Sequence, residues 1–244
     1  MNEQDRILIE GRQDPERVRS MFNAIAPTYD TLNHVISGGL DILWRRKAIS
    51  LLESKRGGRI LDIASGSGDL AVDALALAPE LVVSTDFALE MLRCFADKID
   101  NRQLNKYPIS LAGCDAMRLP FADESFDVAM VAFGIRNFAD RVVALREMHR
   151  VLRPGGISLI LELGVPHNPI VRAGYTLYTR GLLPLMGKII SRHNEAYTYL
   201  PASIARFSEP AEFRSLMESA GFTGCAIHPL TFGVANIFTG IKKT

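Results

Sequence analysis

Short apolar runs alternate with amphipathic segments through the middle of the chain. The runs contain few polar residues on either face, which is typical of strands buried on both sides of a parallel sheet. Strands are expected at residues 59–65, 81–87, 109–115, 126–133 and 156–163, and helices at 68–78, 88–99 and 141–152. The alternation predicts an α/β fold in which helices wrap both faces of a doubly wound sheet.

The flanking regions follow other patterns. Residues 15–25 and 40–52 have helical spacing, and the turn formers between them predict a structured loop. A helical insertion is expected over about 168–207, followed by a helix at 211–222 and two strands that meet in a tight turn at Gly233. These two strands predict an antiparallel hairpin that closes one edge of the sheet.

Composition narrows the range of functions. The chain has 244 residues, enough for one sizeable core, and 28 basic residues against 27 acidic ones give a net charge of +1. This balance excludes an extended nucleic-acid surface. The three cysteines and five histidines lack metal-ligand spacing, so no metal site and a reducing, cytoplasmic compartment are expected. No apolar stretch approaches the length of a spanning helix, which predicts a soluble or peripheral protein.

A glycine loop, "LDIASGSGDLA", joins the first strand of the sheet to its helix. Doubly wound folds bind nucleotides at this position, although a tight turn alone would also require glycine. Gly66, Gly68 and Ala71 also satisfy the GxGxxG/A dinucleotide fingerprint, and Asp86 follows at about the distance of a ribose-binding acid. An NAD-linked oxidoreductase is therefore one interpretation, although no Tyr-x-x-x-Lys pair accompanies the loop.

Three acids at successive strand ends favour a cationic cofactor. Asp62 would repel a pyrophosphate but suits S-adenosylmethionine, which carries a sulfonium and an ammonium and no phosphate. Asp86 can accept hydrogen bonds from both ribose hydroxyls, with Phe87 as an apolar surface for adenine. Asp115 can accept a hydrogen bond from the adenine amine.

The motifs "LDIASGSGDLA", "DFALEML", "DAMRLPFADESFDVAMVAFGIRNFAD" and "EMHRVLRPGG" together resemble class I S-adenosylmethionine-dependent methyltransferases. "VRSMFNAIAPTYDTLN", "FGIRNFAD" and "AYTYLPASIARFSEPAEFRSLMESAGF" narrow the resemblance to the ubiquinone/menaquinone biosynthesis C-methyltransferase family. It implies a Rossmann-like, mostly parallel seven-stranded sheet with an antiparallel terminal strand, and S-adenosylmethionine as cofactor. The implied cofactor-binding residues are Asp62, Ala64, Gly66, Ser67, Gly68, Asp86, Phe87, Asp115, Ala116 and Ala132.

The resemblance also implies one domain over residues 1–244. Residues 1–56 would form a helical lid, 57–166 the cofactor-binding core, 167–210 a substrate-side helical insertion, and 211–244 a terminal helix and hairpin. The implied reaction is methylation of a ring carbon of a prenylated quinol, demethylmenaquinol to menaquinol. The benzoquinol step of ubiquinone synthesis, another lipid-like aromatic acceptor, and a non-enzymatic cofactor-binding scaffold stay open as alternatives.

The apolar run "MVAFGIRNF" ends in an arginine and an amide that packing does not require. The resemblance implies that Arg136 stabilises a phenolate, that Asn137 donates a hydrogen bond to a ring oxygen, and that Tyr29 orients the group that removes the proton. Without the resemblance, the first two side chains would cap the helix at 141–152 or pair with Asp140, and Tyr29 would be a packing residue.

The insertion predicts contact with a polyprenyl tail. Its segment "GYTLYTRGLLPLMGKII" can form an apolar groove or reach the bilayer surface, and it can equally pack on the sheet or form a homodimer face. Arg180, Lys188 and Arg192 would touch anionic headgroups or keep the surface hydrated. Membrane association of a cytoplasmic protein therefore stays open.

Overall fold

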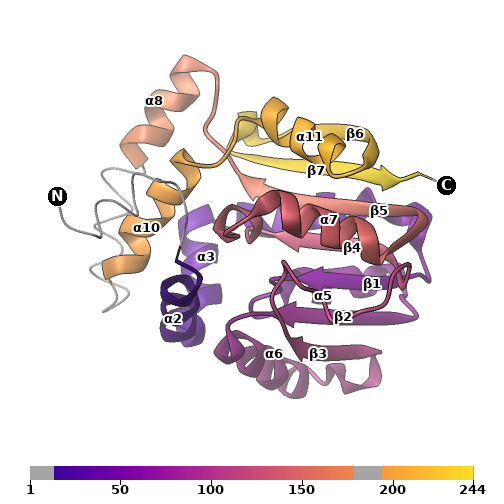
Figure 1. Ribbon diagram of the computed structural model, residues 1–244. Helices are drawn as coiled ribbons and strands as arrows, with labels where there is room; N and C mark the ends of the chain where they lie inside the picture. The colour runs from indigo at the N-terminus through magenta and orange to yellow at the C-terminus, as the bar shows by residue number, and fades with distance from the viewer. Residues whose placement is uncertain (1–13, 179–193, 244) are drawn as a thin grey trace.

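The computed structural model describes residues 14–178 and 194–243, which form one seven-stranded sheet and the helices around it (Figure 1). The strand order is β3-β2-β1-β4-β5-β7-β6. In chain order the strands are β1 (Arg59–Ile63), β2 (Leu81–Asp86), β3 (Ile109–Gly113), β4 (Phe126–Ala132), β5 (Leu152–Leu163), β6 (Phe222–Leu230) and β7 (Ala235–Lys242).

Strands β1 to β5 are parallel to one another, and β7 runs antiparallel between β5 and β6. The α/β class, the mostly parallel sheet and the antiparallel terminal hairpin are thus confirmed. The hairpin turn is Thr231–Gly233, and Gly233 adopts a positive φ of 90°. Strands β2 and β3 are added to the sheet on one side of β1, and β4 and β5 on the other. Doubly wound folds bind ligands in the crevice at such a switch point, which here lies between the carboxyl ends of the neighbouring strands β1 and β4.

Two layers of apolar side chains fix the sheet between helices. One face packs against α4 (Leu40–Ser50), α5 (Asp69–Ala74) and α6 (Leu89–Asn101), and the other against α7 (Arg141–Val151) and α11 (Pro210–Ser219). The buried residues of α7 recur at helical spacing, as Ala144, Leu145, Met148 and Val151. Burial on both faces explains why the central strands β1, β2, β4 and β5 are mostly apolar.

Four further helices lie across the carboxyl ends of the parallel strands, on the left of Figure 1. They are α2 (Pro15–Ile25), α3 (Tyr29–Ser37), α8 (Pro169–Leu177) and α10 (Asn194–Ala205). These helices come from both ends of the sequence, and α10 contacts α2 directly. Within the described ranges, no helix combines the length and the apolar character needed to cross a bilayer.

The prediction of a loop at 26–39 was wrong. Residues 26–28 form a 3-10 turn that leads into helix α3, which ends at Gly38 and Gly39, both with left-handed φ angles of 60° and 79°. Leu32 is buried against Ile36, Tyr178 and Leu200, so contacts with distant segments favour a helix that local turn propensity does not. The predicted insertion contains α8 and α10, while Arg180, Lys188 and Arg192 lie outside the described residues.

Candidate active site

A cavity opens at the carboxyl ends of β1, β2 and β4, and we call it the strand-end cavity. Its empty volume is about 810 Å³, including its open mouth. Of the ten residues expected to bind the cofactor, the seven that line it are Ala64, Gly66, Asp86, Phe87, Asp115, Ala116 and Ala132. Segments up to 68 residues apart in sequence therefore meet at one place, as the parallel topology requires.

The glycine loop has a conformation that side chains would oppose. Gly66 and Gly68 have φ angles of +56° and +81°, in the left-handed region that favours glycine. A Cβ on Gly68 would lie 2.3 Å from the ring of Phe95, so this glycine also permits α6 to pack against the loop. Gly68 does not line the strand-end cavity and acts on the site through the shape of the loop.

Asp62 is the next-to-last residue of β1, and its carboxyl is buried, with an exposed fraction of 1%. Neither carboxylate oxygen has a hydrogen-bond partner of standard geometry in the described part of the chain, although the backbone N–H of Ala71 lies close enough to favour the charged form. Burial raises the pKa of Asp62 well above its usual range, and the charge of Asp86 raises it further. An unsatisfied buried carboxyl of this kind fits a cationic ligand, because a positive charge nearby would offset its desolvation.

Asp86 and Asp115 organise the backbone around the cavity. The two oxygens of Asp86 accept hydrogen bonds from the N–H groups of Gly66 and Ala88, both at 2.8 Å. Burial raises the pKa of Asp86, and these N–H groups oppose the rise. Asp115 accepts a hydrogen bond from the N–H of Met117 at 2.9 Å. Each carboxylate oxygen has a second lone pair, so both acids keep acceptor capacity for ribose or adenine groups.

Arg136 and Asn137 lie on a 3-10 turn directly after β4, and the arginine is buried. Arg136 Nη1 lies 2.6 Å from Oε1 of Glu162, a β5 residue with an exposed fraction of 0%. The backbone N–H of Arg136 also donates to Glu162 Oε2 at 3.2 Å. Burial alone lowers the pKa of Arg136, but the Glu162 carboxylate together with Tyr29 and Tyr199 outweighs this effect, so the guanidinium stays charged.

The turn makes other contacts than the helix cap and the Asp140 pair predicted without the resemblance. Asp140 caps α7 by accepting a hydrogen bond from the N–H of Val143 at 3.0 Å, and Arg136 forms its ion pair with Glu162. Asn137 Oδ1 accepts a hydrogen bond from the hydroxyl of Tyr199 at 2.8 Å. Both side chains are therefore held by partners within the protein, and a role for either at an acceptor stays a prediction.

A second, larger cavity adjoins the first, and we call it the apolar cavity. Its empty volume is about 1860 Å³, including its open mouth, and residues of α2, α3, α4, α8 and α10 line it. Phe22, Tyr29 and Phe133 border both cavities. Arg136 faces the apolar cavity and Asn137 the strand-end cavity, so the turn stands at the boundary between them.

Tyr29 begins α3 at this boundary. Burial raises the pKa of its hydroxyl, while a hydrogen bond with Asn33 and the charge of Arg136 oppose the rise. A neutral phenol is thus held near the guanidinium, in contact with both cavities. The three residues expected to act on the acceptor, Arg136, Asn137 and Tyr29, are brought together.

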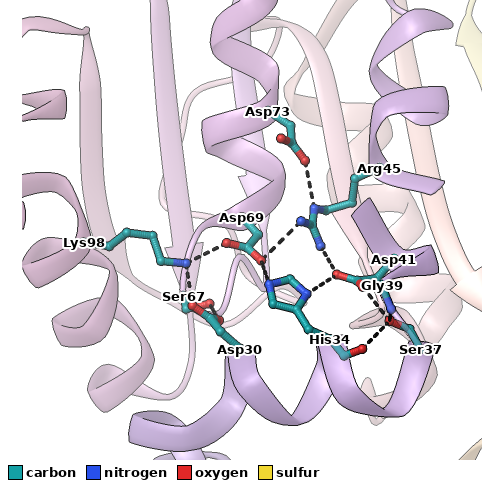
Figure 2. Close-up of polar contacts among 10 residues, drawn as sticks. All are labelled: Asp30, His34, Ser37, Gly39, Asp41, Arg45, Ser67, Asp69, Asp73 and Lys98. Carbon is teal, nitrogen blue, oxygen red and sulfur yellow. Dashed lines mark hydrogen bonds and ion pairs between the residues drawn. The ribbon is translucent and has the colours of Figure 1, made fainter. Parts of the chain in front are cut away.

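A polar network ties the N-terminal helices to the glycine loop (Figure 2). Ser67 donates a hydrogen bond to Asp30 of α3, and Lys98 of α6 lies 2.7 Å from both Asp30 and Asp69. This contact occupies Ser67, which was expected to bind cofactor; Ser67 and Asp62 line a small polar cavity behind the loop. The network holds α3, and with it Tyr29, over the strand ends.

One part of the network has the composition of a metal site. Ligand atoms of His34, Asp41 and Asp69 lie within 4.8 Å of one another. Arg45 lies between the two acids, with Nη1 2.6 Å from Asp41 and Nη2 3.4 Å from Asp69. The guanidinium already supplies the positive charge that a metal would bring, and the expectation of no metal stays a prediction.

Sequence reasoning missed several of these residues. Glu162 stands in an apolar strand, and a charged residue at a fully buried position is a signal that it has a partner. Tyr199 and Ser203 belong to the quoted motif "AYTYLPASIARF" without an assigned role. Lys98 gives no local signal, because its pairing with Asp30 depends on the packing of α3 on α6.

Comparison with known proteins agrees with this geometry. The model of the ubiE/COQ5 methyltransferase family matches residues 11–242. The chain is 41% identical over 230 residues to the ubiquinone/menaquinone biosynthesis C-methyltransferase UbiE of Geobacter sulfurreducens, covering 93% of this chain and 89% of that protein. It is 41% identical over 228 residues to a demethylmenaquinone methyltransferase of Bacteroides fragilis, covering 93% of each.

Solved structures share the fold at low identity. A SAM-dependent methyltransferase of Thermotoga maritima superposes with a TM-score of 0.64 at 19% identity, over 92% of this chain and 99% of that one. The [4+2]-cyclase SpnF superposes with a TM-score of 0.68 at 16% identity, over 96% and 97%. Since a cyclase and a methyltransferase share this architecture, the fold alone does not fix the reaction.

Proposed function

Because the chain belongs to the ubiE/COQ5 methyltransferase family, we propose that it transfers a methyl group from S-adenosylmethionine to a ring carbon of a prenylated quinol, demethylmenaquinol being the preferred acceptor. The observation that carries the proposal is the meeting of the two cavities at Tyr29, Arg136 and Asn137. A small polar ligand at the strand ends and a bulky apolar one beside it would meet at this boundary. A group transfer between two such ligands requires this arrangement.

The polar groups of the strand-end cavity and the acid next to it suit the cofactor. Asp86 and Asp115 supply hydrogen-bond acceptors at the cavity, and Phe87 supplies an aromatic surface. Asp62, which lines the adjoining small polar cavity, supplies an uncompensated buried carboxyl. Bound S-adenosylmethionine provides an electrophilic methyl group on a sulfonium. These residues would hold the cationic end of the cofactor and its adenosine moiety. The glycine loop, which has no side chains at Gly66 and Gly68, would let the cofactor approach the protein backbone.

The acceptor must be made nucleophilic at its ring carbon. A phenol with a pKa near 10 is mostly neutral at physiological pH, so the site must favour its phenolate. Burial raises the pKa of Tyr29 and Tyr175, and the charge of Arg136 opposes that rise in both. An acceptor phenol bound in the apolar cavity would experience the same positive charge.

Asn137 and Tyr29 would complete the acceptor site. The Asn137 carbonyl is engaged by Tyr199, so its NH₂ group can donate to a ring oxygen. Tyr29, held beside Arg136, would orient the water or hydroxyl that accepts the phenolic proton, because arginine itself stays protonated.

Transfer of label tests this function directly. The purified protein would be incubated with methyl-labelled S-adenosylmethionine and short-tailed demethylmenaquinone or demethylated benzoquinone precursors, each with and without a chemical reductant. Label in the naphthoquinone fraction that depends on reductant is the expected result. Preference for the benzoquinone would select the ubiquinone step, and cofactor binding without label on any acceptor would refute the proposed reaction and favour the scaffold.

A matched variant separates catalysis from cofactor binding. Asn137→Ala should reduce the methylation rate by about 100-fold, the order of loss when one donor to a developing oxyanion is removed. Its affinity for S-adenosylmethionine, measured by calorimetry, should change less than threefold. A variant that retains full methylation would remove Asn137 from the acceptor site.

Access of a long tail involves the surface around α8. Val171, Gly174 and Tyr175 line the apolar cavity, while Ile170 and Leu177 of the same helix are 84% and 76% exposed. We propose that this exposed apolar surface makes a peripheral contact with the membrane, from which a prenylated acceptor would enter. The cytoplasmic location and the homodimer stay predictions.

A further inference from the structure

Two polar residues of α10 contact the turn that carries Arg136 and Asn137. Tyr199 and Ser203 are four residues apart, so they project from the same face of the helix. Tyr199 donates a hydrogen bond to Asn137 Oδ1 at 2.8 Å, and Ser203 accepts one from Arg136 Nε at 3.3 Å. Ser203 has no role in the reaction as derived so far, and Tyr199 enters it only through the Asn137 carbonyl.

The contacts are directional. Ser203 is fully buried, and its hydroxyl donates to the carbonyl of Leu200 at 2.8 Å, which leaves its oxygen lone pairs to receive Arg136 Nε. Glu162 holds the same guanidinium from β5 through Nη1, so two elements fix its plane. The Tyr199 hydroxyl engages the carbonyl side of the Asn137 amide, so this contact does not use the NH₂ group.

The same helix also lines the apolar cavity. Leu200, Pro201 and Ile204 border that cavity, between and beside the two polar contacts. Tyr199 itself borders the apolar cavity, whereas Asn137 borders the strand-end cavity, so their hydrogen bond crosses the boundary. An apolar ligand packed against α10 would therefore stabilise the position of the helix that holds the turn.

We propose that Tyr199 and Ser203 are positioning residues, which fix Asn137 and Arg136 for the acceptor oxygen and couple occupancy of the apolar cavity by the acceptor's tail to the rate of methyl transfer. This inference rests on the proposed function. Binding energy from a part of the substrate remote from the reacting carbon would thereby raise kcat as well as lower KM. A tailless quinol should be methylated with a lower kcat than a tailed one, because no tail packs against α10 to hold the helix in place.

The test compares Tyr199→Phe with Tyr107→Phe, a control that also removes only a hydroxyl. Tyr107 is 40% exposed at the surface before β3 and lines neither the strand-end cavity nor the apolar cavity. For wild type and both variants, kcat and KM would be measured with a short-tailed and a tailless demethylmenaquinol. Melting temperature would show that each variant folds.

Tyr199→Phe is expected to lower kcat for the tailed acceptor by roughly 10-fold or more, with the KM for S-adenosylmethionine changed less than threefold. It should also reduce the kcat advantage of the tailed over the tailless acceptor to less than twofold. Tyr107→Phe should keep that advantage, and its kcat should lie within threefold of wild type. Equal kcat values and an equal tail advantage in the two variants would overturn the inference.

A second measurement does not depend on turnover. A nitronaphthol bound to the protein reports its ionisation by absorbance, and the ionised fraction at fixed pH should fall at least threefold in Tyr199→Phe but not in Tyr107→Phe. If wild type methylates no quinol but this difference is seen, the proposed function fails and the positioning role stands. If ionisation of the bound naphthol is the same in all three proteins, the positioning role fails.

Discussion

Replacing Glu162 by glutamine should destabilise the protein strongly, although the two side chains have nearly the same shape. Glu162 Oε1 accepts from Arg136 Nη1 at 2.6 Å and from the N–H of Leu163 at 2.8 Å, and Oε2 accepts from the N–H of Arg136 at 3.2 Å. A glutamine amide has one oxygen, so in either orientation its NH₂ group faces at least one N–H donor. The guanidinium also loses its counter-charge inside the protein.

The magnitude follows from burial. Arg136 and Glu162 are 5% and 0% exposed, and removing one partner of a buried pair leaves an uncompensated charge that costs about 3 to 5 kcal/mol. For a domain of this size, each kcal/mol lowers the melting temperature by about 2 to 4 °C, so a decrease on the order of 10 °C is expected. Chemical denaturation would give the free energy of unfolding directly.

A surface pair provides the control. Arg214 and Glu218 lie 3.7 Å apart on α11, with exposed side-chain fractions of 46% and 52%. Glu218→Gln should cost less than about 0.5 kcal/mol, because solvent screens this pair. If Glu162→Gln were as mild as Glu218→Gln, the buried ion pair would not anchor the turn, and the reasoning about Arg136 would be refuted.

Three further outcomes are expected. Gly68→Ala should lower the free energy of unfolding by about 3 kcal/mol, since the new Cβ meets the Phe95 ring at a positive φ, whereas Gly57→Ala, with φ +77° and open space around it, should cost about 1 kcal/mol. Equal losses in urea titrations would contradict the packing argument. Lys98→Met removes the ion pairs that link α3 to α5, and calorimetry should show S-adenosylmethionine binding weakened about 10-fold. An unaltered affinity would argue against a link from this network to the glycine loop. The raised pKa of Asp62 means that the folded state binds the proton of this carboxyl more tightly than the unfolded state does. The free energy of unfolding should therefore fall as pH rises from the pKa of Asp62 in the unfolded state to its pKa in the folded state. Asp62→Asn should therefore be more stable than wild type at pH 7 by about 1 kcal/mol or more and bind the cofactor less tightly; a less stable variant would show that the carboxylate has a partner in the free protein.

The strands and the parallel order of the sheet follow from local patterns. Both-face apolar runs such as "FDVAMVAF" and the glycine loop after β1 specify buried strands and their carboxyl-end crevice. Local pattern failed at α3, where turn formers such as Pro27 and Asn33 outweighed the burial of Leu32. That burial comes from Tyr178 and Leu200, which are more than 140 residues away, so no local window contains it.

The candidate site divides in the same way. Its strand-end residues, Asp62, Asp86 and Asp115, could be proposed from sequence because parallel strands bring their carboxyl ends to one edge. The partners that orient the chemistry could not be proposed. Glu162 and Tyr199 contact Arg136 and Asn137 only after β5 pairs with β4 and α10 crosses the strand ends.

The sequence by itself therefore determined the strands of the sheet and most of the helices around it, and it predicted where a cofactor would bind, since hydrophobic period and glycine conformation act over a few neighbouring residues. Only the tertiary structure decided which charges are paired and which cavities meet. Ion pairs, desolvation and hydrogen bonds depend on distances between segments that the chain brings together by folding, and these distances leave no signal in the spacing of residues along it.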